Sequence, residues 1–259
     1  MKVVILAGGF GTRISEESSE RPKPMIEIGG MPVLWHIMKY YSHFGFQDFV
    51  ICCGYKGNII KDFFADYYLH NSDITFDFKT GGELAIHNNV AEPWTVTLVD
   101  TKLNTMTGGR IKRIEPFITE DEFMLTYGDG VADVDLHALL ECHRRSGKIG
   151  TLTAVQPESR FGILDVDADG SVRAFREKER VDVGWINGGF MVMNRKIFQY
   201  IEGDNTVFEK EPLERLAREG QLQSYRHSGF WQCMDTLRDK RKLDELWSGG
   251  HAPWRAWDV

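Results

Sequence analysis

A chain of 259 residues, 42% of them hydrophobic and 12% aromatic, is long enough to bury a substantial core as one large domain or as a domain with an appendage. Its formal net charge of −7 argues against nonspecific binding to nucleic acid, which requires a basic face. No apolar stretch approaches the ~18 residues of a membrane-spanning helix, and the four cysteines form no C-x-x-C pair, so we expect a cytoplasmic protein with no membrane or nucleic-acid partner.

The chain begins with an apolar, β-branched run, residues 2–7, which predicts a buried strand. A loop with three glycines follows: Gly8, Gly9 and Gly11. Glycine lets the main chain approach a ligand closely, so such a loop can present backbone N–H groups to a phosphate. Arg13 and Lys23 add two cations near this loop. The combination predicts a binding site for a highly charged anion.

Two common phosphate-binding motifs do not match this glycine loop. A P-loop requires G-x-x-x-x-G-K-[ST], and no glycine of the loop is followed by Lys-Ser or Lys-Thr at that spacing. A dinucleotide fingerprint requires another glycine three residues after Gly11, where this chain has Ile14. A hydride-transferring Rossmann enzyme is therefore disfavoured.

Strand and helix patterns alternate as far as residue 155. Strands are predicted at 48–53, 74–78, 94–99, 122–127 and 151–155, and helices at 31–44, 58–68, 108–115 and 135–146. Such alternation indicates βαβ units and a Rossmann-like, three-layer α/β/α fold with a mostly parallel sheet. Ligands of such sheets bind outside the carboxyl ends of the strands. The glycine loop and residues 128–130 both follow a predicted strand at that edge.

The pattern changes after residue 160. Residues 161–166 and 172–175 predict an antiparallel hairpin, residues 185–193 one further strand, and residues 209–219 and 236–247 two helices. No Pro-, Ser- or Gly-rich linker separates the halves, so we expect a single domain, residues 1–259, with halves of about 1–155 and 156–259 over one continuous sheet. Residues 80–91 are weakly patterned and fit a lid, an oligomer contact or an ordinary loop. The aromatic tail with Trp254 and Trp257 should dock on the domain or on another subunit.

The string L-A-G-G-x-G-T-R over residues 6–13, followed by P-K-P-M over 22–25, resembles the signature of the sugar-1-phosphate nucleotidyltransferases. Further correspondences lie at 127–130, 161–162, 177–178, 187–189 and Asp235. Residues 25–30, 34–38, 51–57 and 229–239 are most similar to the branch of the family that transfers cytidylyl groups to glucose 1-phosphate.

The resemblance implies a homo-oligomeric enzyme of nucleotide-sugar biosynthesis, such as that for O-antigen lipopolysaccharide. Its substrates would be CTP and glucose 1-phosphate, its products CDP-glucose and pyrophosphate, and its cofactor Mg²⁺. The N-terminal half would bind the nucleotide and the C-terminal half, with a smaller antiparallel portion, the sugar. Three alternatives stay open: a uridylyl- or thymidylyltransferase, an enzyme for another sugar 1-phosphate, and a nucleotide-sensing pseudoenzyme subunit.

The reaction needs no general base, because the attacking phosphate oxygen is already ionised. Catalysis should consist of in-line positioning and neutralisation of charge. We expect Arg13 to grip the β- and γ-phosphates, and Lys23, held between two prolines, to act on the α-phosphate or the sugar phosphate. Asp129 and Asp235 would hold Mg²⁺, which commonly takes one or two carboxylates and leaves its other positions to phosphate and water.

The resemblance assigns further residues to each substrate. The expected catalytic residues are Arg13, Lys23 and Asp129, and the expected nucleotide-binding residues are Leu6, Ala7, Gly8, Gly9, Gly11, Thr12, Arg13, Lys23, Thr107, Gly109, Arg110 and Gly128. The expected sugar-phosphate ligands are Gly162, Glu177, Lys178, Asn187 and Gly188. Glu179 stands where the family usually has proline, which leaves Lys178 less rigidly held. Backbone carbonyls near Gly8 or in the 107–110 segment would read the base.

Overall fold

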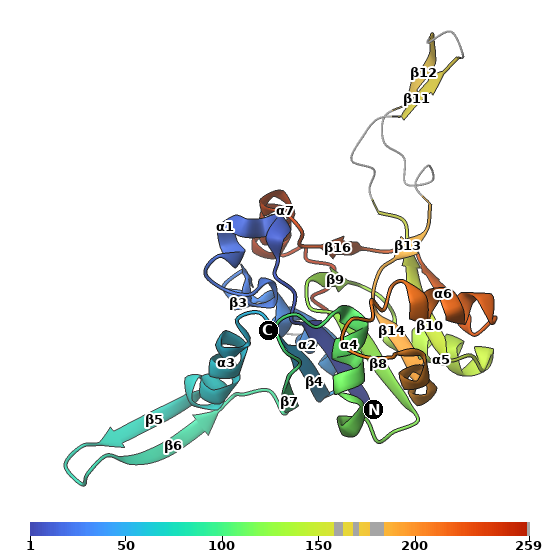
Figure 1. Ribbon diagram of the computed structural model, residues 1–259. Coiled ribbons are helices and arrows are strands. Elements are labelled where there is room, and N and C mark those ends of the chain that lie inside the picture. The colour runs from blue at the N-terminus through green and yellow to red at the C-terminus, as the bar shows by residue number, and fades with distance from the viewer. Residues whose placement is uncertain (158–162, 168–170, 177–183, 258–259) are drawn as a thin grey trace.

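The computed structural model describes residues 1–157, 163–167, 171–176 and 184–257 (Figure 1). Its centre is an eight-stranded sheet in the order β13-β10-β14-β8-β1-β4-β7, with β15 paired to β10. The strands are β1 (Lys2–Ala7), β4 (Asp48–Cys53), β7 (Thr95–Asp100), β8 (Glu122–Tyr127), β10 (Gly150–Val155), β13 (Ile186–Asn187), β14 (Met191–Asn194) and β15 (Leu222–His227). Strands β8, β1, β4 and β7 are parallel, whereas β14 runs antiparallel to both β8 and β10. The predicted α/β class with a largely parallel sheet is confirmed.

Helices cover both faces of the sheet, as the alternation of strand and helix patterns predicts. The α-helices are α1 (Ser15–Ser18), α2 (Val33–His43), α3 (Gly57–His70), α4 (Thr107–Arg113), α5 (Leu136–Ser146), α6 (Glu211–Arg218) and α7 (Leu237–Ser248). The 3₁₀ helices are η1 (Thr12–Ile14), η2 (Lys23–Met25), η3 (Glu115–Phe117) and η5 (Arg195–Tyr200). None of the described helices combines the length and the hydropathy needed to cross a membrane.

The side chains of β1 divide the core into two layers because successive residues of a strand point to opposite faces. Val3 and Ile5 join one buried cluster, which includes residues of α2, α5 and α7. Val4 and Leu6 join the other, with residues of α4, η5 and α6. Among the described residues, the part of the sheet around β1 is therefore buried on both faces.

Four small sheets complete the described fold: β2 (Glu27–Ile28) with β3 (Met31–Pro32), β5 (Ser72–Asp77) with β6 (Glu83–Asn89), β9 (Gly130–Ala132) with β16 (Trp231–Cys233), and β11 (Ile163–Val166) with β12 (Val172–Arg176). The β11–β12 pair is antiparallel, as expected for these two strands, while residues 161–162 and 168–170 of the expected hairpin lie outside the described residues. The β5–β6 hairpin stands away from the body of the molecule (Figure 1). An ordinary loop at 80–91 is thus a wrong expectation for residues 83–89, which form a strand.

The single strand expected over residues 185–193 is also wrong. Gly189 and Phe190 have positive φ angles of 75° and 43°, which break the extended backbone and separate β13 from β14. Phe190 is buried, and its ring stacks on Tyr41 with centroids 5.8 Å apart. The residue with the unusual backbone thus has a buried, packed side chain. The apolar character of residues 185–193 therefore does not indicate one continuous strand.

The C-terminal tail docks on the same domain. Trp254 is fully buried and stacks on Phe230 with ring centroids 5.6 Å apart. Its Nε1 donates to Nδ1 of His36 at 3.4 Å, and Nε2 of His36 lies 2.8 Å from the Ile28 carbonyl oxygen, to which it donates. Burial lowers the pKa of His36 to about 4, so the ring is neutral near pH 7.

Candidate active site

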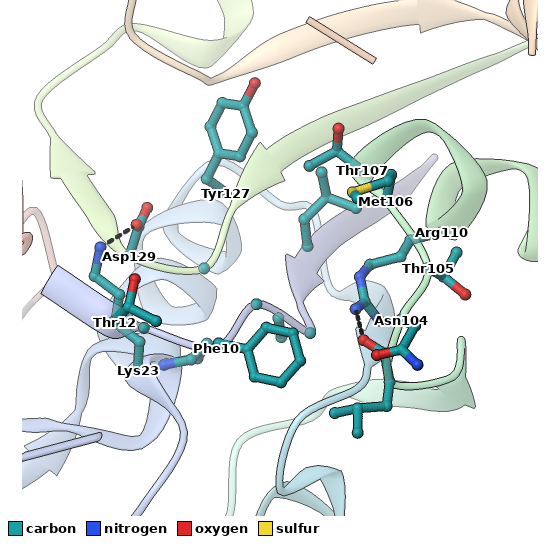
Figure 2. A pocket seen from close by; sticks show the side chains of 18 of the residues that line it. Phe10, Thr12, Lys23, Asn104, Thr105, Met106, Thr107, Arg110, Tyr127 and Asp129 are labelled. Atoms are coloured by element: carbon teal, nitrogen blue, oxygen red, sulfur yellow. Dashed lines mark hydrogen bonds and ion pairs between the residues drawn. The ribbon is translucent and has the colours of Figure 1, made fainter. Parts of the chain in front are cut away.

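A cavity of about 630 Å³ opens where β1 and β8 end, at the edge predicted from the alternation of strands and helices. Its walls are residues 6–12, residues 103–107 and residues 127–129, joined by Lys23, Pro24, Arg110 and Asp235. Figure 2 shows Lys23 and Asp129 at one end and Arg110 with Asn104 at the other. The lining therefore carries separate ionic and polar ends.

The ionic end consists of one lysine between two carboxylates. Lys23 Nζ lies 2.6 Å from Asp129 Oδ2 and 2.5 Å from Asp235 Oδ1. Burial alone would lower the pKa of the Lys23 ammonium, but the charges and hydrogen bonds of the two aspartates raise it overall. The group therefore remains a cation while it is paired in this way.

Strand pairing brings the two aspartates together although they are far apart in the chain. Asp129 lies between β8 and β9, and Asp235 follows β16. The β9–β16 pair aligns Gly130 with Cys233, and Met234 N donates to the Asp129 carbonyl oxygen at 2.8 Å. The N-cap of α7 is Thr236, in a capping box with Asp239. The Asp235 carboxylate is thus not consumed as the helix cap.

The donor set fits a Mg²⁺ ion held by two carboxylates. Both carboxylates pair with the ammonium of Lys23 in this structure, so both already accept a positive charge. Within the described residues no group of three His, Cys, Asp or Glu side chains comes close enough to form an all-protein metal cage. Mg²⁺ rarely uses such a cage and usually completes its shell with phosphate oxygens and water.

The glycine loop makes room for a buried arginine. A Cβ atom on Gly8 would lie 2.2 Å from Arg110 Nη1, and one on Gly54 would lie 2.3 Å from the same atom. Arg110 Nη1 donates to Thr101 Oγ1 at 2.6 Å and to the Lys102 carbonyl oxygen at 2.8 Å. The arginine therefore ties the loop after β7 to the floor of the cavity.

The glycines beside this arginine lie elsewhere. A Cβ atom on Gly109 would lie 2.5 Å from Asp204 Cα, and one on Gly108 would lie 2.7 Å from the Thr206 carbonyl oxygen. Neither glycine lines the cavity. Of the segment expected to lie over the base, Gly108 and Gly109 are thus outside the cavity lining, whereas residues 103–107 form one of its walls.

The remaining residues of the glycine loop lie at the cavity. Gly11 has a φ of 65°, and its carbonyl oxygen accepts a hydrogen bond from Ser18 Oγ at 2.9 Å. Thr12 lines the cavity and starts η1, in which Arg13 is the next residue. The structure therefore places the backbone of Arg13 directly after the loop that would hold the phosphates.

On the sugar side the structure describes two of the five expected residues. Asn187 Nδ2 donates to the Tyr127 hydroxyl at 3.3 Å. Gly188 N donates to the Thr153 carbonyl oxygen at 2.8 Å, and its own carbonyl accepts from Trp231 Nε1 at 2.7 Å. The backbone of Gly188 is thus already paired within the protein. Gly162, Glu177 and Lys178 lie outside the described residues.

Two residues at this site gave no sequence signal. Phe10 lines the cavity, is 47% exposed and packs on Tyr55 with ring centroids 5.5 Å apart. Glu209 accepts hydrogen bonds from Tyr127 and Thr107, which both line the cavity. Only the fold reveals Glu209, because it lies 82 positions from Tyr127 and 102 from Thr107.

In comparisons with known proteins, nearly the whole chain matches nucleotidyltransferases. A family model described as nucleotidyl transferase matches residues 2–239. The chain is 54% identical to glucose-1-phosphate cytidylyltransferase of Salmonella typhi over 259 residues, all of both proteins. It is 43% identical to a probable glucose-1-phosphate cytidylyltransferase of Bacillus subtilis over 258 residues, 99% of this chain and 100% of that protein. The crystal structure of HddC from Yersinia pseudotuberculosis superposes with a TM-score of 0.69 at 25% identity, covering 95% of this chain and 99% of that one.

Proposed function

Because the chain belongs to the nucleotidyl transferase family, we propose that it transfers a cytidylyl group from CTP to glucose 1-phosphate and releases CDP-glucose and pyrophosphate. The observation that carries the choice of substrates is the 54% identity to glucose-1-phosphate cytidylyltransferase over the full length of both proteins. The cavity supports the same reaction class, since the glycine loop and the ionic end meet at the carboxyl ends of β1 and β8.

The chemical step is an in-line displacement at the α-phosphorus of CTP. An oxygen of the sugar phosphate forms the new P–O bond, and the bond to the β-phosphate oxygen breaks, so pyrophosphate leaves with that electron pair. No proton transfer is required, and the protein must instead hold two polyanions in line and offset their charge. The backbone N–H groups around Gly9 and Gly11 and the side chain of Arg13 would bind the β- and γ-phosphates.

Members of this family generally use a divalent metal. Asp129 and Asp235 would hold Mg²⁺, which supplies positive charge to the phosphate oxygens when it is bound. Lys23 is the protein's own cation at the same place. Once its carboxylate partners are engaged elsewhere, its ammonium can turn to the α-phosphate or the sugar phosphate.

The sugar phosphate would bind on the side of Asn187, with Gly162, Glu177 and Lys178 as its further ligands. Both backbone groups of Gly188 are paired within the protein, so its role would be to let the backbone beside Asn187 pack closely on Val155. A Cβ atom at Gly188 would lie 2.8 Å from Val155 Cγ1. Residues 1–155 would thus bind the nucleotide and residues 156–259 the sugar, within one domain. The wall at 103–107, which Arg110 braces, would face the base.

Copies of the chain would associate through the β5–β6 hairpin. A two-stranded hairpin alone in water is at best marginally stable. Phe76, Phe78 and Leu84 on this hairpin are 54%, 83% and 46% exposed, and the first two rings stack on each other. These apolar side chains are exposed in the single chain, and a second copy of the chain would cover them. Phe78→Ser should then shift the molar mass in light scattering towards the monomer, and an unchanged mass would exclude this contact.

The enzyme would act in the cytoplasm. Its four cysteines, Cys52, Cys53, Cys142 and Cys233, are all free, as is usual in a reducing compartment.

The experiment that tests the function is product analysis with purified protein. CTP, glucose 1-phosphate and Mg²⁺ should yield CDP-glucose and pyrophosphate in equal amounts, and chelation of the metal should stop both. If no CDP-glucose forms under these conditions, the proposed function is wrong. CMP release without sugar transfer would point instead to a nucleotide-hydrolysing or nucleotide-sensing protein.

A further inference from the structure

One carboxylate outside the cavity binds two side chains of the cavity wall. Glu209 Oε1 accepts a hydrogen bond from the Tyr127 hydroxyl at 2.8 Å, and Oε2 accepts one from Thr107 Oγ1 at 2.6 Å. Tyr127 ends β8 and Thr107 begins α4, so the two side chains come from different walls, as Figure 2 shows. Glu209 itself does not line the cavity.

The proton positions in this network follow from its neighbours. Phe208 N donates to Thr107 Oγ1 at 2.9 Å, so the proton of that hydroxyl is free to point at Glu209. Asn187 Nδ2 donates to the Tyr127 hydroxyl at 3.3 Å, so the tyrosine proton also points at Glu209. Each hydroxyl therefore accepts one hydrogen bond and donates one, which fixes both groups in a single orientation.

The bonds to Glu209 are of the strong kind. A carboxylate acceptor makes shorter and stronger hydrogen bonds than a neutral one. Burial, followed by the charge of Glu209 and its hydrogen bond, raises the pKa of Tyr127, so the phenol keeps its proton. The tyrosine is thus always a donor to Glu209 and never a competing anion beside the substrate phosphates.

The segment that carries Glu209 also braces the start of α4. Met106 N donates to the Asp204 carbonyl oxygen at 2.8 Å, and Gly109 N donates to the Thr206 carbonyl oxygen at 3.2 Å. The backbone of α4 is therefore held without Glu209. Loss of the carboxylate would leave two hydroxyls of the cavity wall without their acceptor but would not free the helix.

We propose that Glu209 is a positioning residue for the sugar phosphate, acting through the hydroxyl of Tyr127 on Asn187. It holds the Tyr127 hydroxyl where Asn187 Nδ2 donates to it. Together with Gly189 N, which donates to Asn187 Oδ1 at 3.0 Å, this contact fixes the orientation of the Asn187 amide. The inference rests on the proposed function, because it takes Asn187 as a ligand of the sugar phosphate. Glu209 touches no substrate and takes no part in the displacement itself.

The test is steady-state kinetics of Glu209→Gln. A glutamine keeps the shape but can accept from only one of the two hydroxyls through its single oxygen. The KM for glucose 1-phosphate should rise about 10-fold, the scale of one lost charge-assisted hydrogen bond, while kcat stays within about 2-fold. The matched control is Glu219→Gln: Glu219 accepts from the Tyr200 hydroxyl at 2.7 Å on a surface away from this cavity. That variant should leave both constants unchanged.

A double substitution separates positioning from a general effect on folding. In a Tyr127→Phe background the hydroxyl is already missing, so Glu209→Gln should add less than about 3-fold to the KM for glucose 1-phosphate. If Glu209→Gln folds poorly, Glu209→Asp takes its place in the test. Its shorter side chain cannot reach both hydroxyls, so the same rise in KM for glucose 1-phosphate is expected. Urea unfolding of each variant reports whether it is folded.

An unchanged KM for glucose 1-phosphate in folded Glu209→Gln or Glu209→Asp would overturn the proposal, as would effects of Glu209→Gln and Tyr127→Phe that simply multiply. A fall in kcat at constant KM would also overturn it, because it would place Glu209 in the chemical step. Failure of the proposed function looks different: the wild-type protein itself would then form no CDP-glucose.

Discussion

Lys23 and Asp235 lie 212 positions apart in the chain, yet Lys23 Nζ is 2.5 Å from Asp235 Oδ1. Their side chains are only 12% and 20% exposed, and Asp129 completes the group from the other side. A lysine that bridges two carboxylates occupies the position that a divalent cation held by the same oxygens would need. If Asp129 and Asp235 hold Mg²⁺, as proposed, the cation and the ammonium would compete for these oxygens, and the first two predictions depend on that competition.

Removal of either carboxylate should abolish most of the activity. Asp129→Asn and Asp235→Asn should each lower kcat about 10²-fold or more, the scale of one lost preorganised electrostatic group. Both should also need more Mg²⁺ for half-maximal rate. Initial rates over a Mg²⁺ titration measure this, and near-normal turnover of both variants at limiting Mg²⁺ would show that the metal binds elsewhere.

Removal of the lysine should make stability depend on the metal. Lys23→Met leaves two carboxylates facing each other, which should cost about 2 kcal/mol of unfolding free energy without metal. Mg²⁺ should restore part of that loss and raise the Tm of Lys23→Met more than that of the wild-type protein. The control is Lys39→Met, because Lys39 is 15% exposed and pairs with a single carboxylate, Glu92, at 2.5 Å. Equal Mg²⁺ responses in all three proteins would contradict the competition.

Two adjacent glycines should respond differently to alanine. A Cβ atom on Gly8 would collide with the Arg110 guanidinium, which four protein acceptors hold in place, whereas one on Gly9 would meet nothing within 4 Å. Gly8→Ala should therefore lower the unfolding free energy by about 1–3 kcal/mol, and Gly9→Ala by less than about 0.5 kcal/mol. Urea denaturation compares them; equal losses would mean that Arg110 gives way without cost.

Docking of the C-terminal tail should weaken in acid because of His36. The folded protein holds the pKa of His36 at about 4, and an unfolded chain returns it to the ordinary 6.5. Between these values the unfolded state binds more protons, so the contribution of His36 to stability is complete above pH 6.5 and is lost as the pH falls towards 4. The loss should reach about 3 kcal/mol, at 1.36 kcal/mol per unit.

Unfolding free energies measured at pH 7 and pH 4.5 test this for His36. The control is His36→Gln, whose side-chain amide can still donate to the Ile28 carbonyl oxygen but does not titrate. The wild-type protein should lose more stability between the two pH values than the variant does. Identical losses would show that folding does not lower the pKa of His36.

The sequence predicted the fold best where one physical signal dominates. The strand at Asp48–Cys53 is predicted with its observed bounds because a short apolar run with β-branched residues is typical of a buried strand. The β6 strand was missed because all seven of its residues are exposed, so no hydrophobic alternation marks it. The break between β13 and β14 was missed because it depends on a positive φ at Phe190, which local propensity disfavours.

The site divides in the same way. Motif residues such as Lys23 and Asp129 are visible in the sequence, and the structure brings them together at the cavity. The role of Arg110 was not visible, because its acceptors at Thr101, Lys102 and Leu103 are largely backbone atoms without a residue signature. Glu209 was missed for a related reason, since its function depends on a long-range contact. Sequence reasoning therefore finds charges, and the fold shows which of them are already engaged.

The choice of base tests the central claim most directly. Cytosine carries an N4 amino donor where uracil carries an O4 acceptor, so a site that accepts from the amino group leaves an acceptor unpaired when uracil binds, at a cost of about 1–3 kcal/mol. The measurement is kcat/KM for CTP, UTP and dTTP at one concentration of glucose 1-phosphate, with the release of pyrophosphate as the readout. We expect CTP to exceed both by roughly 5- to 150-fold. Equal turnover of UTP or dTTP would contradict the cytidylyl assignment and leave only the nucleotidyltransferase chemistry.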